Sequence, residues 1–390
     1  MKILLSFVLA FVFTGAALAQ APQPPEVAAK SYIVIDLTSN QTLAERDADA
    51  LADPASLTKL MTAYVAWQAL KEKKFSLDQK LPVSKLAWDE RKKGGSLMFI
   101  EPSMKPTFNE LMTGLIVDSG NDASVAMAEA VGGSVDQFVG MMNRQAQAFG
   151  LKNTTFKNVT GLTEAGHKTT ARDVAVVAAH IIRDYPQLFA YYSIKEYKFN
   201  NISQPNRNVL LRRDPSVDGM KTGHTDAAGY CLVATAQREY PNLGANGKGP
   251  GPRRILTVVL NTTSSEARAN ESQKLLNWAY QAFDTVRLFD DTKPIVSVPV
   301  WKGKTSEAKL GAAGGLFVSV PKGEGAKLQT KIERTDPLVA PLTKGQRVGT
   351  IKVSTASGAP VIDVPLVLLE PVEQAGIFGR AWDSLRLWIK

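Results

Sequence analysis

The chain has 390 residues, of which 44% are hydrophobic and 21% charged, a composition that excludes wholesale disorder and a membrane protein with many spans. One Cys excludes an internal disulfide framework and a Cys-clustered zinc site, and three His leave little material for a metal centre. We therefore expect no metal cofactor. The net charge of +9 admits three partners: nucleic acid, an anionic membrane surface or an acidic polymer.

The N-terminus predicts export. Lys2 precedes an apolar run over residues 3–13, and the small residues 15–19 end in an Ala-x-Ala cleavage pattern at Ala19. The apolar run is shorter than the ~20 residues that a spanning helix needs. We expect a signal peptide over residues 1–19, with an uncleaved anchor as the alternative. Export argues against a nucleic-acid partner.

Hydrophobic spacing predicts mixed helix and sheet over residues 20–284. A strand over 31–37 precedes a helix that begins near Pro54, so Ser56 is placed in the first turn of an amphipathic helix. A helix over 108–117 is expected to break at 118–121. Further helices are predicted over 123–131, 135–149, 170–183 and 265–283, strands over 229–237 and 255–261, and an exposed loop over 241–252.

The pattern changes at a predicted domain boundary in residues 284–292. Short β-branched runs then alternate with Gly and Pro turns, which indicates a small all-β domain over residues 285–373. The runs cover residues 295–300, 316–320, 327–332, 348–353 and 361–368. Residues 285–390 carry 15 basic and 10 acidic side chains, against 30 and 27 in residues 20–284. The basic excess is thus concentrated near the C-terminus.

Residues 374–390 predict an amphipathic helix. At 100° per residue its apolar side chains fall within an arc of about 140°, with Arg380, Asp383, Arg386 and Lys390 opposite. Two Trp on the apolar side and a net basic polar side favour a helix lying on an anionic membrane, over one docked on the β-domain. The apolar set is Ile377, Phe378, Ala381, Trp382, Leu385, Trp388 and Ile389.

Three short motifs indicate nucleophilic catalysis when taken together. Ser56-Leu57-Thr58-Lys59 has the form Ser-x-x-Lys, which on a helix places hydroxyl and amine one turn apart on one face. The same form recurs at residues 306–309 and 319–322, but in β-type surroundings. Ser119-Gly120-Asn121 falls between two predicted helices, and Lys221-Thr222-Gly223 leads towards a strand. Each motif alone is weak evidence; all three in this order are strong evidence.

With these motifs the chain resembles the penicillin-binding and serine β-lactamase superfamily, and most closely its membrane-anchored D-alanyl-D-alanine carboxypeptidases. The similar segments are residues 53–62, 117–123, 158–162, 170–173 and 217–225. The resemblance implies an α+β fold: a catalytic domain with an antiparallel sheet and a helical cluster, then a small β-domain and an amphipathic helix. It also implies a periplasmic enzyme on the outer face of the cytoplasmic membrane. Such an enzyme removes the terminal D-Ala from peptidoglycan pentapeptides and is acylated by β-lactams.

The residue types fit this chemistry. Ser56 is a weak nucleophile at neutral pH and needs an adjacent base, which Lys59 can supply only as the neutral amine. Burial and repulsion from a second cation such as Lys221 would lower the pKa of Lys59 towards the working range. Ser119 would relay a proton to the leaving amine, and Asn121 would orient Lys59 and a substrate carbonyl.

The substrate ends in a carboxylate, which the Thr222 hydroxyl and a guanidinium could bind. The resemblance points to Arg268 and Arg207 for the guanidinium, and to the backbone amides of Ser56 and His224 for the oxyanion hole. It also places the loop that carries His167 at the rim of the site. His167 either contacts the substrate or only orders its neighbours. The expected substrate-binding set is Lys221, Thr222, Gly223, Arg268, Arg207 and His167.

Three alternatives remain open. A β-lactamase would use the same motifs, but residues 161–167 offer Glu164 and His167 without the Glu-x-x-Asn pattern of a deacylating loop. A DD-endopeptidase would use the same residues on crosslinked peptides. An inactive cell-wall-binding protein is disfavoured because every motif residue is present. His180 and Cys231 are interpreted as structural, Cys231 as a small buried apolar residue.

Overall fold

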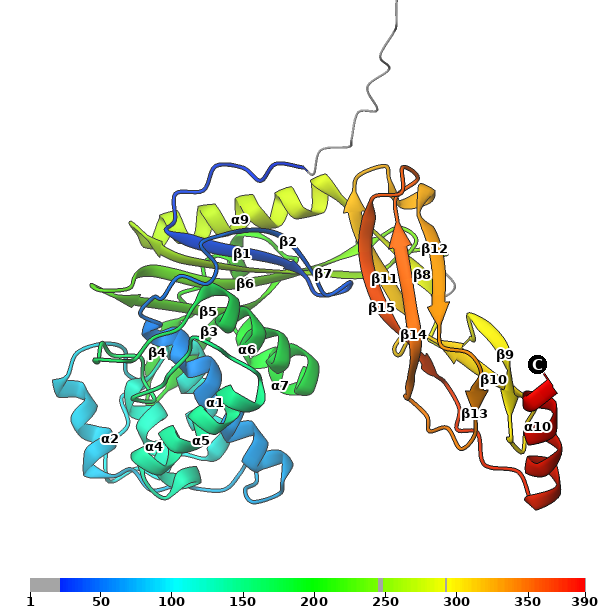
Figure 1. Cartoon of the computed structure of the whole chain (residues 1–390). Coiled ribbons are helices and arrows are strands. Elements are labelled where there is room, and N and C mark those ends of the chain that lie inside the picture. Colours follow the sequence, from blue (N-terminus) through cyan, green and yellow to red (C-terminus); the bar gives the residue numbers. More distant parts are fainter. Residues whose placement is uncertain (1–21, 245–247, 292, 390) are drawn as a thin grey trace, which may run out of the picture.

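The computed structural model of the chain describes residues 22–244, 248–291 and 293–389. The expected signal peptide over residues 1–19 lies outside the described residues. A mixed helix-and-sheet domain is followed by an all-β domain and a terminal helix (Figure 1). The fold class expected from the sequence is confirmed.

A five-stranded antiparallel sheet organises the first domain, with the order β2-β1-β7-β6-β5. Side chains alternate between its faces: Ile33 and Val258, which are register partners, pack on one face, and Val34 and Val259 pack on the other. Because β5 is an edge strand, its outer edge is available to the active site. The strands are β1 (Ser31–Asp36), β2 (Gln41–Arg46), β5 (Val217–Thr225), β6 (Gly229–Tyr240) and β7 (Gly251–Thr262).

Helices cover both faces of this sheet (Figure 1). Helix α9 (Ser265–Ala282) packs Leu275 and Leu276 on one face against Val259. The helical cluster on the other face carries most of the active-site residues. It contains α1 (Lys59–Lys71), α2 (Lys85–Asp89), α3 (Phe108–Thr113), α4 (Asn121–Gly132), α5 (Val135–Ala148), α6 (Ala171–Asp184) and α7 (Pro186–Phe189), with the short turns η1 (Ala55–Thr58), η2 (Glu90–Lys92), η3 (Gly114–Asp118) and η4 (Ala190–Ser193). The hairpin β3 (Glu196–Phe199) and β4 (Ile202–Pro205) and the turn α8 (Leu210–Arg213) complete the domain.

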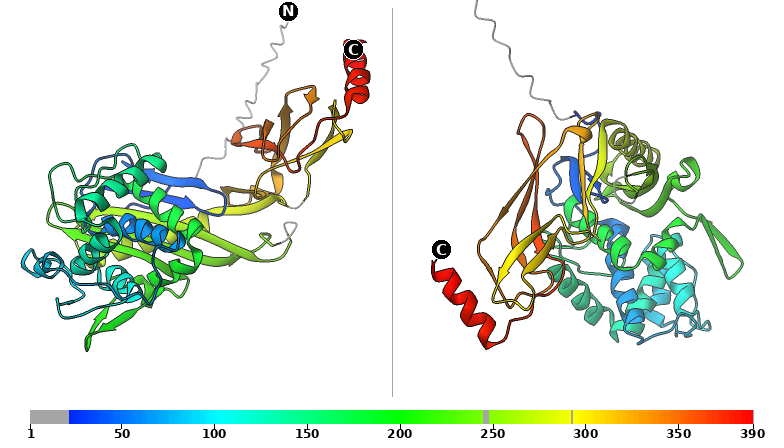
Figure 2. Two further views of the ribbon diagram at one scale, coloured as in Figure 1. Left: turned by 90° about the horizontal axis from the view of Figure 1, so that it is seen from below. Right: turned by 90° about the vertical axis from the view of Figure 1, so that its right-hand side faces the viewer.

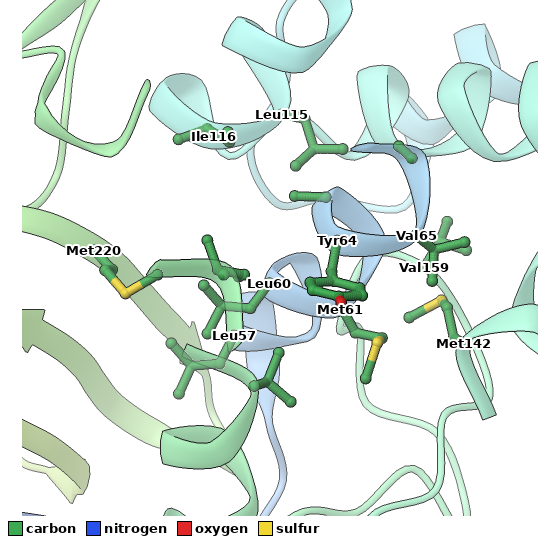
Figure 3. Close-up of a cluster of buried hydrophobic side chains, with 14 of the residues drawn as sticks. Leu57, Leu60, Met61, Tyr64, Val65, Leu115, Ile116, Met142, Val159 and Met220 are labelled. Atoms are coloured by element: carbon green, nitrogen blue, oxygen red, sulfur yellow. The ribbon is translucent and has the colours of Figure 1, made fainter. Parts of the chain in front are cut away.

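Helix α1 is not amphipathic, which corrects the expectation from sequence. Its residues are buried without interruption from Lys59 to Trp67, more than two turns, so every face of the helix is covered. Figure 3 shows the side chains of α1 with Met220 of β5 on one side, Val159 on the other and Leu115 of η3 above them. A helix enclosed in this way holds its first turn rigidly, and that turn carries the Ser-x-x-Lys motif.

The other expected elements are found with shifted ends. The helices expected over 123–131, 135–149, 170–183 and 265–283 correspond to α4, α5, α6 and α9. The helix expected over 108–117 changes to a π-helical turn at Gly114. The expected loop 241–252 is shorter because β7 begins at Gly251, and the Lys-Thr-Gly motif lies on strand β5 itself.

The C-terminal domain contains a six-stranded sheet, with the order β12-β14-β15-β10-β9-β13, and a ribbon of β8 and β11. Its core includes Leu310, Val318, Ile351 and Leu366. The second and third copies of Ser-x-x-Lys reach strands β10 and β11, so neither lies on a helix. The elements are β8 (Phe283–Phe289), β9 (Val296–Trp301), β10 (Glu307–Gly311), β11 (Leu316–Pro321), η6 (Gly325–Lys327), β12 (Gln329–Arg334), β13 (Leu338–Val339), β14 (Arg347–Ser354) and β15 (Pro360–Leu368).

A buried polar network joins the two domains around Asp36, at the end of β1. Its carboxylate accepts hydrogen bonds from Arg253 Nε at 2.8 Å, Thr285 Oγ1 at 2.6 Å and Ser319 Oγ at 2.8 Å. Thr285 and Ser319 belong to the β8–β11 ribbon, and the side chains of Asp36 and Arg253 are both 0% exposed. A buried charge pair with several hydrogen bonds has one good geometry, so it fixes how the ribbon meets the catalytic sheet.

The terminal helix α10 (Ile377–Ile389) lies beyond the β-domain (Figure 2). Its polar side faces the domain: the Lys302 backbone amide donates to Asp383 Oδ2 at 2.6 Å, and the Arg386 guanidinium lies 5.4 Å from the Trp301 ring centroid. Its apolar side faces outwards, with Phe378 92% and Trp388 86% exposed. No helix within the described residues is long and apolar enough to cross a membrane.

Candidate active site

The nucleophile candidate Ser56 lies in the tight turn η1, immediately before α1. The residue before it, Ala55, has a left-handed backbone with φ of 46°, a strained conformation for a non-glycine residue. Gly161 packs on this turn, and a Cβ at that position would lie 1.8 Å from the Ala55 carbonyl oxygen. Gly223 of β5 also packs on this turn, where an added Cβ would lie 3.2 Å from the Ala55 Cβ. Two glycines therefore set the position of Ser56.

Lys59 is fully buried and its amine makes three contacts. Nζ lies 3.0 Å from Ser56 Oγ, 2.8 Å from Asn121 Oδ1 and 2.7 Å from the Thr160 carbonyl oxygen. The Asn121 and Thr160 oxygens can only accept hydrogen bonds, so each of them takes one N–H group of the Lys59 amine. A neutral amine has two N–H groups and one lone pair. The lone pair is thus left for the proton of the Ser56 hydroxyl, which is the arrangement a general base requires.

The electrostatics favour that neutral form. Burial and, after it, the Arg207 cation lower the pKa of Lys59 to about 7, against the opposing effect of Glu90 and Asp122. Arg207 is thus a cation that the sequence did not suggest for this role, and the expected repulsion between Lys59 and Lys221 is also present, because it lowers the pKa of Lys221. At neutral pH a large fraction of Lys59 is able to accept a proton.

Ser119 and Lys221 form the second half of the constellation. Ser119 adopts a left-handed conformation with φ of 59° between η3 and α4, which turns its side chain into the site. Lys221 Nζ is buried and donates to Ser119 Oγ at 2.9 Å and to the Thr222 carbonyl at 3.1 Å. Burial, with the Lys59, Arg207 and Arg268 cations, lowers the pKa of Lys221 well below its usual range.

A cavity of about 500 Å³ opens over these residues. Arg268 is buried in its wall and donates to the Gly223 carbonyl at 3.0 Å and to Ser265 Oγ at 3.2 Å. Arg207 donates to the Asp118 carbonyl at 2.5 Å. The described lining residues are Ser56, Gly95, Ser96, Ser119, Pro205, Asn206, Arg207, Val209, Arg212, Thr222, Gly223, His224, Tyr230, Ser265 and Arg268. The expected substrate residues Thr222, Gly223, Arg268 and Arg207 therefore meet at one cavity.

His167 is placed differently from the expectation of a rim residue. It is 1% exposed and does not line the cavity. Its Nδ1 accepts from the Lys157 backbone amide at 2.8 Å, so Nε2 carries the proton and donates to Thr58 Oγ1 at 2.8 Å. Burial lowers the pKa of His167 to about 4. The sequence left open whether His167 contacts the substrate or orders its neighbours, and the structure favours the second role, because His167 holds Thr58 in the turn that carries Ser56.

Two other side chains considered in the sequence analysis, Glu164 and Cys231, are not among the described residues that line the Ser56 cavity. Glu164 lines a separate cavity and accepts from Asn158 Nδ2 at 2.9 Å, so it is not placed as a deacylating base. Cys231 is buried, and burial raises the pKa of its thiol to about 11, in agreement with a packing role. Among the described residues, no group of three or more His, Cys, Asp or Glu could hold a metal ion.

Sequence reasoning missed four residues at the site. Thr160 binds Lys59 through its backbone, which no side-chain motif reveals. Tyr230 stacks on His224, with ring centroids 4.0 Å apart, because the two are register partners of β6 and β5. Ser96, on a loop, and Arg212, on the short turn α8, line the cavity without belonging to a motif. Pairing the strand after Lys-Thr-Gly with its neighbour would have found Tyr230.

Comparison with known proteins decides the family. Residues 18–245 match the D-alanyl-D-alanine carboxypeptidase family of peptidases, and residues 283–374 match the C-terminal domain of penicillin-binding protein 5. The chain belongs to the D-alanyl-D-alanine carboxypeptidase family. It is 42% identical over 387 residues to the carboxypeptidase DacC of Escherichia coli, covering 98% of this chain and 94% of that protein. It is 40% identical over 371 residues to DacA of the same organism, covering 94% and 89%.

Solved structures of this carboxypeptidase family agree with the fold. Penicillin-binding protein 5 from Haemophilus influenzae is 37% identical, with a TM-score of 0.82, covering 90% of this chain and 100% of that chain. The Streptomyces K15 DD-transpeptidase is 27% identical with a TM-score of 0.60 and covers 67% of this chain. Because the match to penicillin-binding protein 5 covers 90% of this chain, it includes the β-domain as well as the catalytic domain.

Proposed function

We propose that the protein is a serine D-alanyl-D-alanine carboxypeptidase that acts through an acyl-enzyme on Ser56. The observation that carries this is the environment of Lys59 Nζ, whose two acceptors leave its lone pair for the Ser56 hydroxyl. Ser56 Oγ attacks the carbonyl carbon of the penultimate D-Ala while its proton passes to Lys59. The resulting oxyanion would be stabilised by the backbone amides of Ser56 and His224.

Collapse of this intermediate breaks the bond to the terminal D-Ala. The leaving amine needs a proton, which Lys59 returns through the Ser119 hydroxyl, and Lys221 holds that hydroxyl at 2.9 Å. Water then attacks the ester, with Lys59 again accepting a proton, and the shortened peptide leaves. Each proton taken up is given back, so the chain needs no further reactant besides water.

The cavity walls explain why a C-terminal residue would be cleaved. Thr222 and the buried Arg268 provide fixed donors for a carboxylate beside the nucleophile. Edge strand β5 can pair with an extended peptide backbone, which would align the scissile bond with Ser56. A β-lactam presents a carboxylate and a strained amide to the same groups, so we infer that it acylates Ser56.

The test is D-Ala release from diacetyl-Lys-D-Ala-D-Ala. The wild-type protein should release D-Ala, and both Ser56→Ala and Lys59→Met should lose at least about 1,000-fold in kcat/KM, because nucleophile and base act as a unit. Folding of each variant is checked by circular dichroism. Release by Ser56→Ala at the wild-type rate would overturn the proposal.

We infer further that the enzyme is periplasmic and that α10 attaches it to the outer face of the cytoplasmic membrane. The support is the sequence of residues 1–19 and the exposed apolar side of α10, with Phe378 and Trp388 almost fully exposed. The helix contacts its own domain through its polar side, so the apolar side remains available. A β-domain and helix of this kind would hold the catalytic site away from the bilayer.

Vesicle sedimentation tests this attachment. The protein should sediment with anionic vesicles, and Phe378→Ser with Trp388→Ser should release it. Leu51→Ser is the matched control, because Leu51 is an exposed apolar residue, at 61%, on the catalytic domain. Equal binding by the double variant and the wild type would contradict attachment through α10.

A further inference from the structure

Arg212 is an arginine at the cavity that the proposed reaction does not use. It lies on the short turn α8, which the buried residues Leu210 and Leu211 anchor. Its guanidinium donates to the Asn206 carbonyl at 3.1 Å and to the Lys195 carbonyl. Two backbone carbonyls therefore hold an exposed guanidinium in a defined place, with N–H groups to spare among its five.

The three cavity arginines differ in the groups that they contact. Arg207 reaches the Asp118 carbonyl beside Ser119, and Arg268 is buried against the Gly223 carbonyl. Arg212 is exposed and instead contacts the Asn206 and Lys195 carbonyls, which do not belong to the three motifs. Arg207 and Arg268 thus belong to the catalytic end, and Arg212 belongs to the rim.

The charge of the cavity exceeds what one terminal carboxylate requires. Its described lining includes three guanidiniums and no Asp or Glu side chain. Arg212 also has no carboxylate within ion-pair distance among the described residues, whereas its neighbour Arg213 pairs with Glu266 at 2.7 Å. A single carboxylate beside Ser56 is served by Thr222 and Arg268. The rim guanidinium therefore fits a second anionic group, farther from the scissile bond.

We propose that Arg212 binds a second carboxylate of an acidic peptidoglycan peptide and so makes the enzyme selective for acidic stems. This rests on the proposed function. The carboxylate has two possible sources with the same chemistry: the stem peptide on the acyl side, or a peptide joined through the leaving amine, as in a crosslinked substrate. The second source would give the site an endopeptidase preference.

Two pairs of peptides test this selectivity. In the first pair, a γ-linked D-Glu precedes Lys-D-Ala-D-Ala with its α-carboxylate free or amidated. In the second, a crosslinked dimer has the carboxylates of the leaving peptide free or amidated, apart from the one beside the cleaved bond. The readout is the ratio of kcat/KM for the free form to that for the amidated form, measured at low and at high salt.

The wild-type protein should prefer the free form in one pair by about tenfold, mainly through KM, and Arg212→Gln should bring that ratio to about one. The peptide pair whose ratio changes in Arg212→Gln identifies which peptide supplies the second carboxylate. Arg213→Gln is the matched control, since it removes the same charge from the same turn outside the cavity, and its ratio should equal that of wild type. Ratios unaffected by Arg212→Gln in both pairs, or an equal loss in Arg213→Gln, would overturn the inference. Failure of the wild type to release D-Ala from any peptide would instead overturn the proposed function.

Discussion

Gly161 holds the nucleophile in place, and its replacement by Ala should damage catalysis more than folding alone explains. A Cβ at residue 161 would lie 1.8 Å from the Ala55 carbonyl oxygen and 2.9 Å from the Ser56 nitrogen. Ordinary contact begins near 3.4 Å, so the turn at Ser56 must retreat by roughly 1.6 Å. A displacement of about 1 Å at reacting groups costs on the order of 100-fold in rate.

The stability change can be separated from the rate change. Gly161 has φ of 88°, where Ala costs about 1 kcal/mol, and overpacking adds about 1–3 kcal/mol. We expect Gly161→Ala to lower the free energy of unfolding by about 2–4 kcal/mol and the β-lactam acylation rate by at least about 100-fold. Urea unfolding and stopped-flow acylation measure the two quantities.

Gly166 supplies the matched control in the same loop. Its φ is 79°, but an added Cβ would meet only the flexible Lys157 side chain, at 3.2 Å. Gly166→Ala should therefore cost about 1 kcal/mol and change acylation less than about threefold. Acylation by folded Gly161→Ala at the wild-type rate, or equal effects of the two substitutions, would refute the reasoning.

Three further predictions concern titration and burial. Because the neutral form of Lys59 is the base and its pKa is about 7, kcat/KM should rise with pH through about 7. Burial also raises the pKa of Asp118 to about 7, so Asp118→Asn is the control: it should leave the rise of kcat/KM with pH unchanged. The pKa of His167 is 6.5 in the unfolded chain and about 4 in the folded protein. The free energy of unfolding should therefore fall by about 3 kcal/mol as the pH drops from 6.5 to about 4. Urea unfolding at several pH values measures this fall, and His167→Gln should reduce it. An unchanged dependence of the free energy of unfolding on pH in His167→Gln would refute the prediction. Asp36→Asn leaves the Arg253 charge buried and should cost about 3–5 kcal/mol, whereas Asp49→Asn, at an exposed ion pair, should cost at most about 1 kcal/mol.

Local spacing in the sequence was enough to predict the Ser56–Lys59 contact. The two residues are three apart and meet at the start of a helix, as periodicity requires. The contact between Lys221 and Ser119 joins residues 102 apart, and only the family resemblance pointed to it. Spacing carries no information about such a pairing, because tertiary packing of β5 against the helical cluster creates it.

The differences between the sequence expectations and the structure also have physical causes. The helical spacing of apolar residues predicts an amphipathic α1, yet Lys59 and Thr62 are buried as well, because both have hydrogen-bond partners. The family resemblance places the His167 loop at the rim and leaves two roles open; both ring nitrogens bind the protein, which fits the ordering role. The Asp36–Arg253 pair, 217 residues apart, gives no sequence signal, since charged residues are usually exposed.

Intact-mass measurement after treatment with penicillin tests the central claim most directly, namely that Ser56 is the nucleophile and Lys59 its base. The wild-type protein should gain the mass of one β-lactam, with the adduct on the peptide containing Ser56. Ser56→Ala should gain none, and Lys59→Met should be acylated at least about 1,000-fold more slowly. Acylation of Ser56→Ala to the wild-type extent, or of Lys59→Met at the wild-type rate, would contradict the account.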